Sequence, residues 1–267
     1  MTRAQADRLH DALSATFEGI FSAIGNATFE RRAGHVRMLF PSVPIAVFNG
    51  VVVESEPCSG IADSVREVEE VAVPCGIQIR ANRHTGIESE AKQLGFTART
   101  PMPGMTASPD ELVDARAPGL RIGRVEDEAG LLEASRISAA VSSAPLEWML
   151  ALFAPELLEL PGFAVHLGWV GGEAVTVAMG YRTHADVGIF NVGTPSQHRR
   201  RGYGSAITAH AARAGFDEGA DLAWLQTSEI GEPVYRSLGF GHVEMHYLLR
   251  RPNPQPRSPS VHRSCDE

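Results

Sequence analysis

The 267-residue chain has little cysteine and no long apolar segment. Its three cysteines, Cys58, Cys75 and Cys265, are scattered and include no Cys-x-x-Cys pair, so the sequence predicts neither a disulfide framework nor a zinc site. The beginning of the chain, Met1 to Glu18, is polar and lacks the apolar core of a signal peptide, and no later stretch has the pattern of a membrane span. We therefore expect a cytoplasmic protein that does not act at a membrane.

The chain also lacks an excess of basic residues. Its 24 Lys and Arg are outnumbered by 32 Asp and Glu, and the net charge of −8 at pH 7 argues against a general nucleic-acid or anionic-membrane binder. Ten histidines are present, and His242 and His246 would share one face of a strand, but nothing nearby completes a metal-ligand set. We expect these two histidines to be exposed and the protein to hold no metal.

Against this acidic background, one basic segment lies between a strand pattern and a helix pattern. Residues 194–205 (Thr-Pro-Ser-Gln-His-Arg-Arg-Arg-Gly-Tyr-Gly-Ser) join the alternating strand formers of Val187–Val192 to apolar residues at helical spacing from Ile207 to Ala214. A helix N-terminus offers free N–H groups and a positive dipole end, and Gly202 and Gly204 leave its backbone open to phosphate oxygens. The segment is therefore predicted to bind a pyrophosphate.

Two known phosphate motifs fit this segment poorly. A nucleotide P-loop needs lysine after its last glycine, whereas Gly204 is followed by Ser205 and Ala206. A dinucleotide fingerprint needs a glycine where Arg199 stands, although Asp221 lies at a suitable distance for its acidic residue. The remaining pattern, Arg-x-x-Gly-x-Gly after a strand, resembles the acetyl-CoA signature of the GNAT superfamily of N-acyltransferases.

The following segment strengthens this resemblance. Asp221–Thr227 has the pattern of a buried strand, Gly231–Phe240 that of a short helix stopped by glycine, and His242–Arg250 that of a further strand. This order is similar to that of GNAT enzymes, in which a tyrosine three residues before Leu-Gly-Phe lies near the CoA sulfur; Tyr235 has that place. Ser228 stands where the family often has asparagine, and its hydroxyl lacks the second polar group of an amide.

The resemblance implies an acetyltransferase, that is, a transferase of acyl groups other than aminoacyl groups. Acetyl-CoA would give its acetyl group directly to a primary amine, and Tyr235 would protonate or hydrogen-bond the departing thiolate. Backbone groups of Val192 and Thr194 would bind the pantetheine amides, and the amides from Arg200 to Ser205 the pyrophosphate. The implied CoA-binding residues are Val192, Gly193, Thr194, Arg199, Arg200, Arg201, Gly202, Tyr203, Gly204, Ser205 and Ser228.

Several aspects of function stay open at the level of sequence. The acceptor is a small-molecule amine or a protein amine, the acyl-chain preference is undetermined, and a homodimer is possible. Candidates for the general base are Glu173, His184, Asp186 and Glu229. The alternative to an enzyme is a non-catalytic acyl-CoA-binding module with a regulatory or scaffold role.

The chain also contains a faint internal repeat. Three short segments recur in the same order about 140 residues later: Phe48–Asn49 with Phe190–Asn191, Gly76–Arg80 with Leu222–Gln226, and Lys92–Phe96 with Arg236–Phe240. The first copy has no Arg-x-x-Gly-x-Gly before its helical segment, and Ala91 stands in the place of the tyrosine. We interpret it as a degenerate GNAT-like half.

These observations predict an α/β (α+β) fold with a GNAT-like mixed, mostly antiparallel sheet flanked by helices and duplicated in tandem. The proline-containing stretch Thr100–Met105 and the residues after it are expected to link the halves. The predicted domains are a degenerate GNAT-like domain (1–115), a catalytic acetyltransferase domain (116–250) and a disordered tail (251–267).

Overall fold

The computed structural model describes residues 3–81 and 83–252, so nearly all of the predicted tail, including Cys265, lies outside the described part. The strands are β1 (Thr28–Arg32), β2 (His35–Leu39), β3 (Gly50–Val53), β4 (Gly76–Arg80), β5 (Ala98–Ala107), β6 (Arg121–Arg124), β7 (Phe163–Val170), β8 (Glu173–Thr183), β9 (Asp186–Gly193), β10 (Leu222–Gln226) and β11 (Gly241–Arg250). The helices are α1 (Arg3–Ala23), α2 (Ile61–Glu70), α3 (Thr85–Gln93), α4 (Glu128–Ser142), α5 (Leu146–Leu152), α6 (Tyr203–Asp217) and α7 (Glu232–Ser237), with short 3-10 helices η1 (Pro155–Glu159) and η2 (Ser196–His198).

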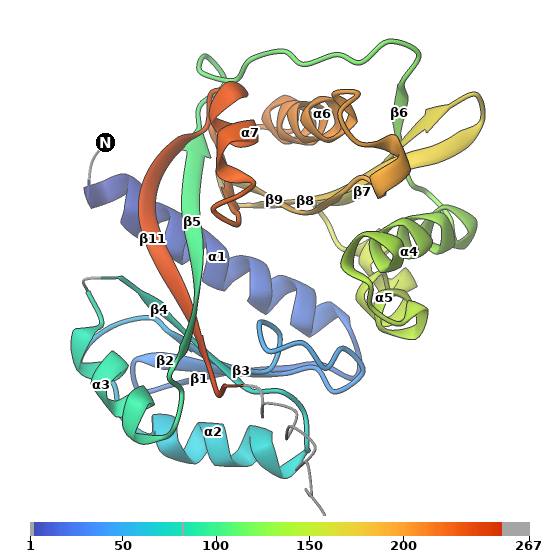
Figure 1. The fold of residues 1–267 in the computed structure, drawn as a ribbon. Helices are drawn as coiled ribbons and strands as arrows, with labels where there is room; N and C mark the ends of the chain where they lie inside the picture. The colour runs from blue at the N-terminus through green and yellow to red at the C-terminus, as the bar shows by residue number, and fades with distance from the viewer. Residues whose placement is uncertain (1–2, 82, 253–267) are drawn as a thin grey trace, which may run out of the picture.

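The strands of the described residues form one sheet in the order β1-β2-β3-β4-β11-β5-β10-β9-β8-β7-β6. Only the pairs β3–β4 and β9–β10 are parallel among these strands. Helices flank the sheet (Figure 1), which confirms the predicted mixed, mostly antiparallel architecture. The succession β-β-β-α-β-α-β occurs twice, from β1 to β5 and from β7 to β11. The predicted tandem duplication is therefore present in the fold.

The two halves exchange their last strands. Strand β5 ends the first half, yet it lies between β11 and β10; strand β11 ends the second half, yet it lies between β5 and β4. β5 pairs with β11 from Ala98 to Thr106 and with β10 from Gly104 to Ala107. Figure 1 shows β5 and β11 running together from one end of the molecule to the other. Each half therefore supplies a strand that the other half's sheet needs.

This exchange corrects the prediction that Thr100–Met105 is a linker, because the segment forms the middle of β5. Proline is rare in paired strands, since it has no N–H to donate. The Thr227 N–H donates to Pro103 O (3.0 Å), so the backbone of Pro103 faces the β10 side, and that of Pro101 faces the same way. β10 pairs with β5 only from Gly104 onward. Pro101 and Pro103 thus lie on the side of β5 that faces β10, before the two strands begin to pair. Among the described strands, their missing N–H groups therefore interrupt no ladder.

The two halves agree in backbone detail at their helix ends. Gly60 before α2 and Gly202 before α6 are both left-handed, with φ of 80° and 79°. After α3 and α7 the chain turns back through the same backbone hydrogen bond, which Ala91 O accepts at 2.9 Å in the first half and Tyr235 O at 3.0 Å in the second. Ala91 therefore occupies the place of Tyr235, as the Leu-Gly-Phe repeat predicted.

One of the three sequence echoes does not join equivalent positions. Phe48–Asn49 precedes β3, whereas Phe190–Asn191 lies inside β9. The Asn49 side chain instead holds the loop before β3: its Oδ1 accepts from Phe40 N (2.7 Å), and its Nδ2 donates to Val43 O (2.8 Å) and Ile45 O (3.1 Å). Buried Asn49 thus fixes the conformation of a loop in the first half.

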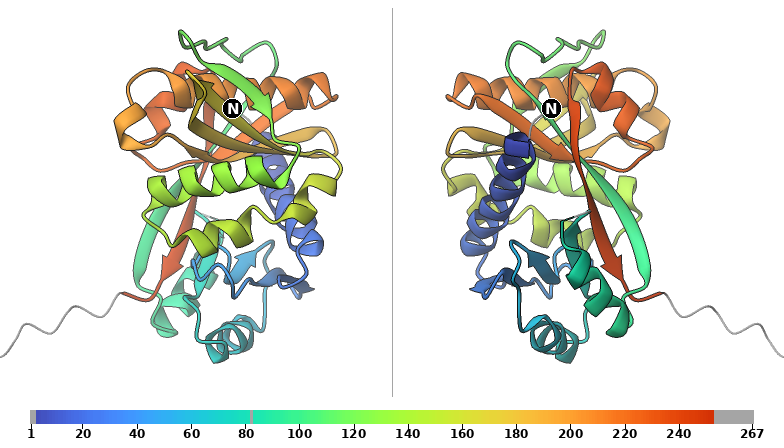
Figure 2. Two further views of the ribbon diagram at one scale, coloured as in Figure 1. Left: turned by 90° about the vertical axis from the view of Figure 1, so that its right-hand side faces the viewer. Right: turned by 90° about the vertical axis from the view of Figure 1, so that its left-hand side faces the viewer.

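Helix α1 extends from the first half onto the sheet of the second. Leu9, Leu13, Phe17 and Phe21 recur every four residues along α1, and all four are buried. They share one core with Met179 of β8. Figure 1 shows α6 on one face of β7–β9 and α4 with α1 on the other, and Figure 2 shows α1 beside α4 and α5 in the middle of the molecule. The junction between the halves is therefore a helical layer over the second half's sheet.

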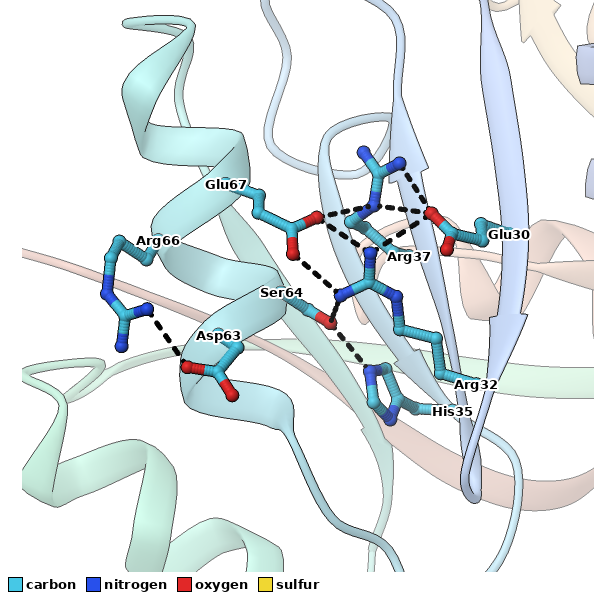
Figure 3. A network of polar contacts seen from close by, with 8 residues as sticks. All are labelled: Glu30, Arg32, His35, Arg37, Asp63, Ser64, Arg66 and Glu67. Carbon is cyan, nitrogen blue, oxygen red and sulfur yellow. Dashed lines mark hydrogen bonds and ion pairs between the residues drawn. The ribbon is translucent and has the colours of Figure 1, made fainter.

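In the first half, a polar network attaches α2 to β1 and β2 (Figure 3). The Arg32 guanidinium donates to Glu67 (2.7 Å) and to Ser64 (2.9 Å), and the Ser64 hydroxyl also lies 2.8 Å from Nε2 of buried His35. Arg37 lies 3.1 Å from Glu67. The hydrogen bond from Arg32 holds the pKa of Glu67 below its usual range, so this carboxylate stays ionised near neutral pH. The network anchors the helix that corresponds to α6.

Three histidines are buried where α1 crosses β11. His10 on α1 stacks on His246 of β11 with ring centroids 5.7 Å apart, and His84 before α3 lies 6.2 Å from His10. The prediction that His246 is exposed is wrong, because strand exchange places β11 inside the sheet, where α1 covers it. Burial lowers the pKa of His10 to about 3 and that of His84 to about 4.

These pKa values predict a pH-dependent stability. The unfolded chain protonates histidine near pH 6.5, while folded His10 stays neutral to about pH 3, so only the unfolded state gains this proton between those values. The free energy of unfolding therefore falls as the pH is lowered through this window. Between pH 7 and pH 5, urea unfolding of the parent should lose roughly 2 kcal/mol more than that of His10→Phe. Carboxylates contribute the same pH dependence to the parent and to His10→Phe, so the difference between the two proteins isolates His10. An equal decrease in the free energy of unfolding in both proteins would contradict the prediction.

Candidate functional site

Strands β9 and β10 begin as a parallel pair and then separate. Asp186–Gly188 of β9 faces Leu222–Trp224 of β10. Beyond these residues β9 follows β8 as far as Gly193, while β10 follows β5 as far as Gln226. We call the resulting gap, between residues 189–193 and residues 225–226, the wedge. Backbone groups on its two edges lie outside the β9–β10 ladder and can pair with an extended, amide-containing chain.

A bulge in β9 bends the strand at the wedge. The register between β8 and β9 shifts between Val177 and Met179, and Asn191 has a left-handed backbone with φ of 50°. Asparagine tolerates this conformation better than most residues do. Its Nδ2 donates to the Ser138 hydroxyl of α4 (3.1 Å). Bulges redirect strands and often lie beside functional sites, so this one accounts locally for the separation of β9 from β10.

Residues 194–205, for which the sequence predicts pyrophosphate binding, follow β9, and we call them the phosphate turn. Side chains fix its first residues: the Thr176 hydroxyl donates to Gly193 O (2.9 Å) and lies 2.9 Å from the Thr194 hydroxyl, and Arg199 Nε donates to Thr194 O (3.0 Å). The backbones of Arg200, with φ of 61°, and of the N-cap residue Gly202, with φ of 79°, are both left-handed. The turn thus delivers the chain directly to the N-terminus of α6.

The N-terminus of α6 is suited to an anion. Its first turn contains no acidic residue, and its leading N–H groups have no acceptor within the helix. A Cβ on Gly204 would come no closer than 3.6 Å to another residue, so the backbone is approachable there. Arg200 and Arg201 are exposed and form no ion pair with another described residue, so their charge is uncompensated. These features together favour a phosphate group.

Two other predicted CoA-binding residues are partly or fully covered. Tyr203, 5% exposed, packs with Ala117, Val175 and Ala206 and anchors the start of α6. Val192 is half-buried against the core under α6, and its place in β9 puts its backbone on the wedge. The tyrosine side chain is thus a packing group, while its amide belongs to the open first turn.

Tyr235 and Ser228 follow β10 and therefore lie at the same edge of the sheet as the phosphate turn. This follows because β9 and β10 are parallel, so their carboxyl ends meet there. Tyr235 on α7 packs against Phe240, with ring centroids 6.3 Å apart, and burial raises the pKa of its hydroxyl. The exposed Ser228 hydroxyl accepts from Gly231 N (3.2 Å) and so helps to organise the turn into α7.

The four candidate bases do not converge on the wedge. Glu173 lies at the β7–β8 turn and contacts His198 Nε2 (3.2 Å), beside the phosphate turn. His184 and Asp186 lie at the opposite end of β9, where Asp186 pairs with Arg8 (2.7 Å). Glu229 is exposed in the loop after β10. The structure therefore offers no preformed base among them.

A cavity of about 330 Å³, which the sequence did not predict, adjoins the wedge. Its walls come from α1, from the loop before β3, and from α4, α5 and strands β8 to β10, so residues far apart in the sequence form it. No local signal could reveal it. In the described part of the chain, no cluster of His, Cys, Asp and Glu side chains is arranged to hold a metal ion. Nor is any helix there long and apolar enough to span a membrane.

Comparisons with known proteins agree with this geometry. Residues 174–243 match the model of the acetyltransferase (GNAT) domain family. No curated protein matches the sequence significantly. The fold is similar to that of a GCN5-related N-acetyltransferase from Kribbella flavida, with a TM-score of 0.70, 20% identity, and coverage of 92% of this chain and 96% of the other.

Two further solved structures have a similar fold. A GCN5-related N-acetyltransferase from Sphaerobacter thermophilus is 17% identical with a TM-score of 0.58, covering 83% of this chain and 78% of its own. A tandem GNAT protein from the clavulanic acid biosynthesis pathway is 10% identical with a TM-score of 0.59, covering 86% and 85%. Residues 174–243 of this chain thus match the GNAT domain family, and most of its length has the fold of GNAT proteins, tandem members included.

Proposed function

We propose that this protein is an acetyl-CoA-dependent N-acetyltransferase that transfers acetyl directly to a primary amine. The observation that carries the proposal is the position of the wedge, the phosphate turn and Tyr235 at one edge of the sheet. The match of residues 174–243 to the GNAT family supports acyl transfer from acyl-CoA. The chemistry then needs no metal and no covalent enzyme intermediate.

Binding of CoA uses the backbone more than side chains. Val192, Gly193 and Thr194 would pair with the pantetheine amides across the wedge, and the amides from Arg200 to Ser205 would hold the pyrophosphate. Arg199 acts indirectly, because its Nε holds Thr194 O. The exposed Arg200 and Arg201 add positive charge to the site.

Tyr235 has the protonation state that a general acid needs. Burial raises the pKa of its hydroxyl above the usual value near 10, so the hydroxyl keeps its proton at neutral pH. It would give this proton, or a hydrogen bond, to the CoA thiolate as the amine attacks the acyl carbon. The amine must attack in its neutral form, which for a pKa of about 10.4 costs roughly 4.6 kcal/mol at pH 7.

We assign the reaction to the second half, residues 116–250, and regard residues 1–115 as a degenerate partner. Helix α2, which corresponds to α6, has Asp63 in its first turn, where a carboxylate repels phosphate, and Asp63 pairs with Arg66 (2.9 Å). Ala91 also has no hydroxyl to offer in the place of Tyr235. One CoA per chain is the expected stoichiometry.

Gly202→Val should weaken CoA binding, because a β-branched residue at φ of 79° distorts the backbone that presents the amides to pyrophosphate. Calorimetric titration should give one site in the parent and at least about tenfold weaker affinity in the variant. Gly219→Val is the matched control: it introduces the same strain, φ of 98°, at the other end of α6, where no neighbour lies within 4 Å. Equal CoA affinity in folded Gly202→Val and Gly219→Val would remove the turn from the site.

Tyr235→Phe should lower kcat by about 10²–10⁴-fold with nearly unchanged CoA affinity, because the ring still packs while the proton donor is lost. Tyr247→Phe is the control, since Tyr247 lies on β11 in the first half's core, away from the wedge. Turnover is followed as CoA release with a panel of primary amines. A Tyr235→Phe rate within about twofold of the parent would exclude a general-acid role. Absence of turnover with every amine, despite CoA binding, would favour the non-catalytic alternative.

A further inference from the structure

The cavity beside the wedge belongs to both halves of the chain. Its lining includes Phe17 of α1 and Phe48 of the loop before β3 from the first half. From the second half come Phe190 and Asn191 on β9 and Gln226 at the end of β10. The last three bound the wedge, so the cavity opens onto the place where the acyl group of CoA would lie under the proposed function.

The chemistry of the cavity wall is apolar and aromatic. Phe21, Phe40, Phe163 and Trp224 add to the rings already named, and the methionine and aliphatic side chains of neighbouring elements complete the wall. No Asp, Glu, Lys, Arg or His is among the described residues that line it. A charged group of a ligand inside the cavity would therefore lose its hydration without gaining an ion-pair partner, at a large cost in binding free energy.

The wall is also held in place before any ligand arrives. Buried Asn49 fixes the loop that carries Phe40 and Ile45 through three hydrogen bonds to that loop. Phe17 and Phe21 pack edge to face on α1, 5.9 Å apart. Pre-organised apolar pockets of about 300 Å³ and more are typical small-molecule sites. This cavity falls at the small end of that range.

The apolar lining is interrupted by a few polar side chains, among them Thr16, Asn191 and Gln226. Thr16 Oγ1, Trp224 Nε1 and Gln226 Nε2 are buried and lack a hydrogen-bond partner among the described residues. Gln226 is oriented by Gln78, whose Nε2 donates to its Oε1 (3.3 Å). The cavity therefore suits an occupant that is mainly apolar and carries a small number of polar atoms.

We propose that this cavity binds the apolar part of the acceptor, so that the substrate is a small hydrophobic amine with an aromatic or similarly bulky apolar group. The inference rests on the proposed function. The apolar surroundings disfavour the ammonium form of the amine and so promote the neutral nucleophile. The ammonium releases its extra proton to solvent before the amine attacks. The proton that nitrogen loses as the C–N bond forms replaces the one that Tyr235 gives to the departing thiolate, so the step balances without a side-chain base among the four dispersed candidates.

The first test compares two primary amines with acetyl-CoA. 2-Phenylethylamine carries one ring and one amine, whereas putrescine carries a second cation. We expect kcat/KM for 2-phenylethylamine to exceed that for putrescine by at least about tenfold. A preference for putrescine would overturn the inference, even if its second ammonium group were bound by the aromatic rings of the cavity. The acetyltransferase proposal would remain intact. If no primary amine is acetylated, the proposed function itself is overturned. Calorimetry would then still test whether the cavity binds 2-phenylethylamine in the presence of CoA.

A second arm distinguishes an apolar acceptor from an apolar acyl chain. If the cavity holds the acceptor, octanoyl-CoA should be a poorer donor than acetyl-CoA with 2-phenylethylamine, because the chain and the ring would compete for one space. Octanoyl-CoA as the better donor would show that the cavity binds the acyl chain and would overturn the assignment.

Variants at Val47 locate the effect. Val47 lines the cavity and is only half-buried, so it tolerates change better than the core phenylalanines. Val47→Glu should lower kcat/KM for 2-phenylethylamine by at least about tenfold with CoA affinity within about twofold of the parent. Val71→Glu, the same change at an exposed position after α2, should leave both unchanged. Should Val47→Glu fail to fold, Val47→Phe narrows the cavity without adding charge, and it should impair 2-phenylethylamine more than butylamine. Unchanged turnover in a folded Val47 variant would contradict the proposal.

Discussion

The exchange of β5 and β11 is the constraint on which the rest of the structure depends. β10 pairs with β5 of the first half, and β4 pairs with β11 of the second half. In a self-contained half, each of these positions would be taken by that half's own last strand. Most backbone polar groups of the central strands are satisfied only across the junction between halves, and leaving them unpaired in the interior is costly. Neither half therefore has a complete sheet of its own, and one continuous core joins α1 to the second half.

The proposed site uses this shared architecture twice. β5 holds β10 as far as Gln226 while β9 follows β8, so the pairing of β10 with a strand from the other half helps to keep the wedge open. The first half then places α1 and the loop held by Asn49 over the wedge, where they form the wall of an apolar cavity. The first repeat lacks a phosphate turn and the tyrosine, and under our proposal it helps to bind the acceptor substrate of the second repeat.

Features set by short stretches of chain could be predicted from the sequence. The phosphate turn depends on Gly202 and on a helix start, and the place of Tyr235 depends on the Leu-Gly-Phe turn that stops α7; both are local. Features set by long-range pairing were missed. Thr100–Met105 has the proline content of a linker, and only the position where β10 begins to pair with β5 explains why prolines fit that strand. The burial of His246 and the cavity likewise depend on α1 crossing strands distant in sequence.

The most direct test of this account is to separate the halves. Residues 1–115 and residues 116–252 are produced as two polypeptides, and CoA binding is measured by calorimetry for each alone and for the two after joint refolding. The account predicts that neither fragment alone binds CoA, because residues 116–252 lack β5, and that the reassembled pair binds one CoA with an affinity close to that of the intact chain. A fragment of residues 116–252 that is folded alone and binds CoA as tightly as the intact chain would contradict it.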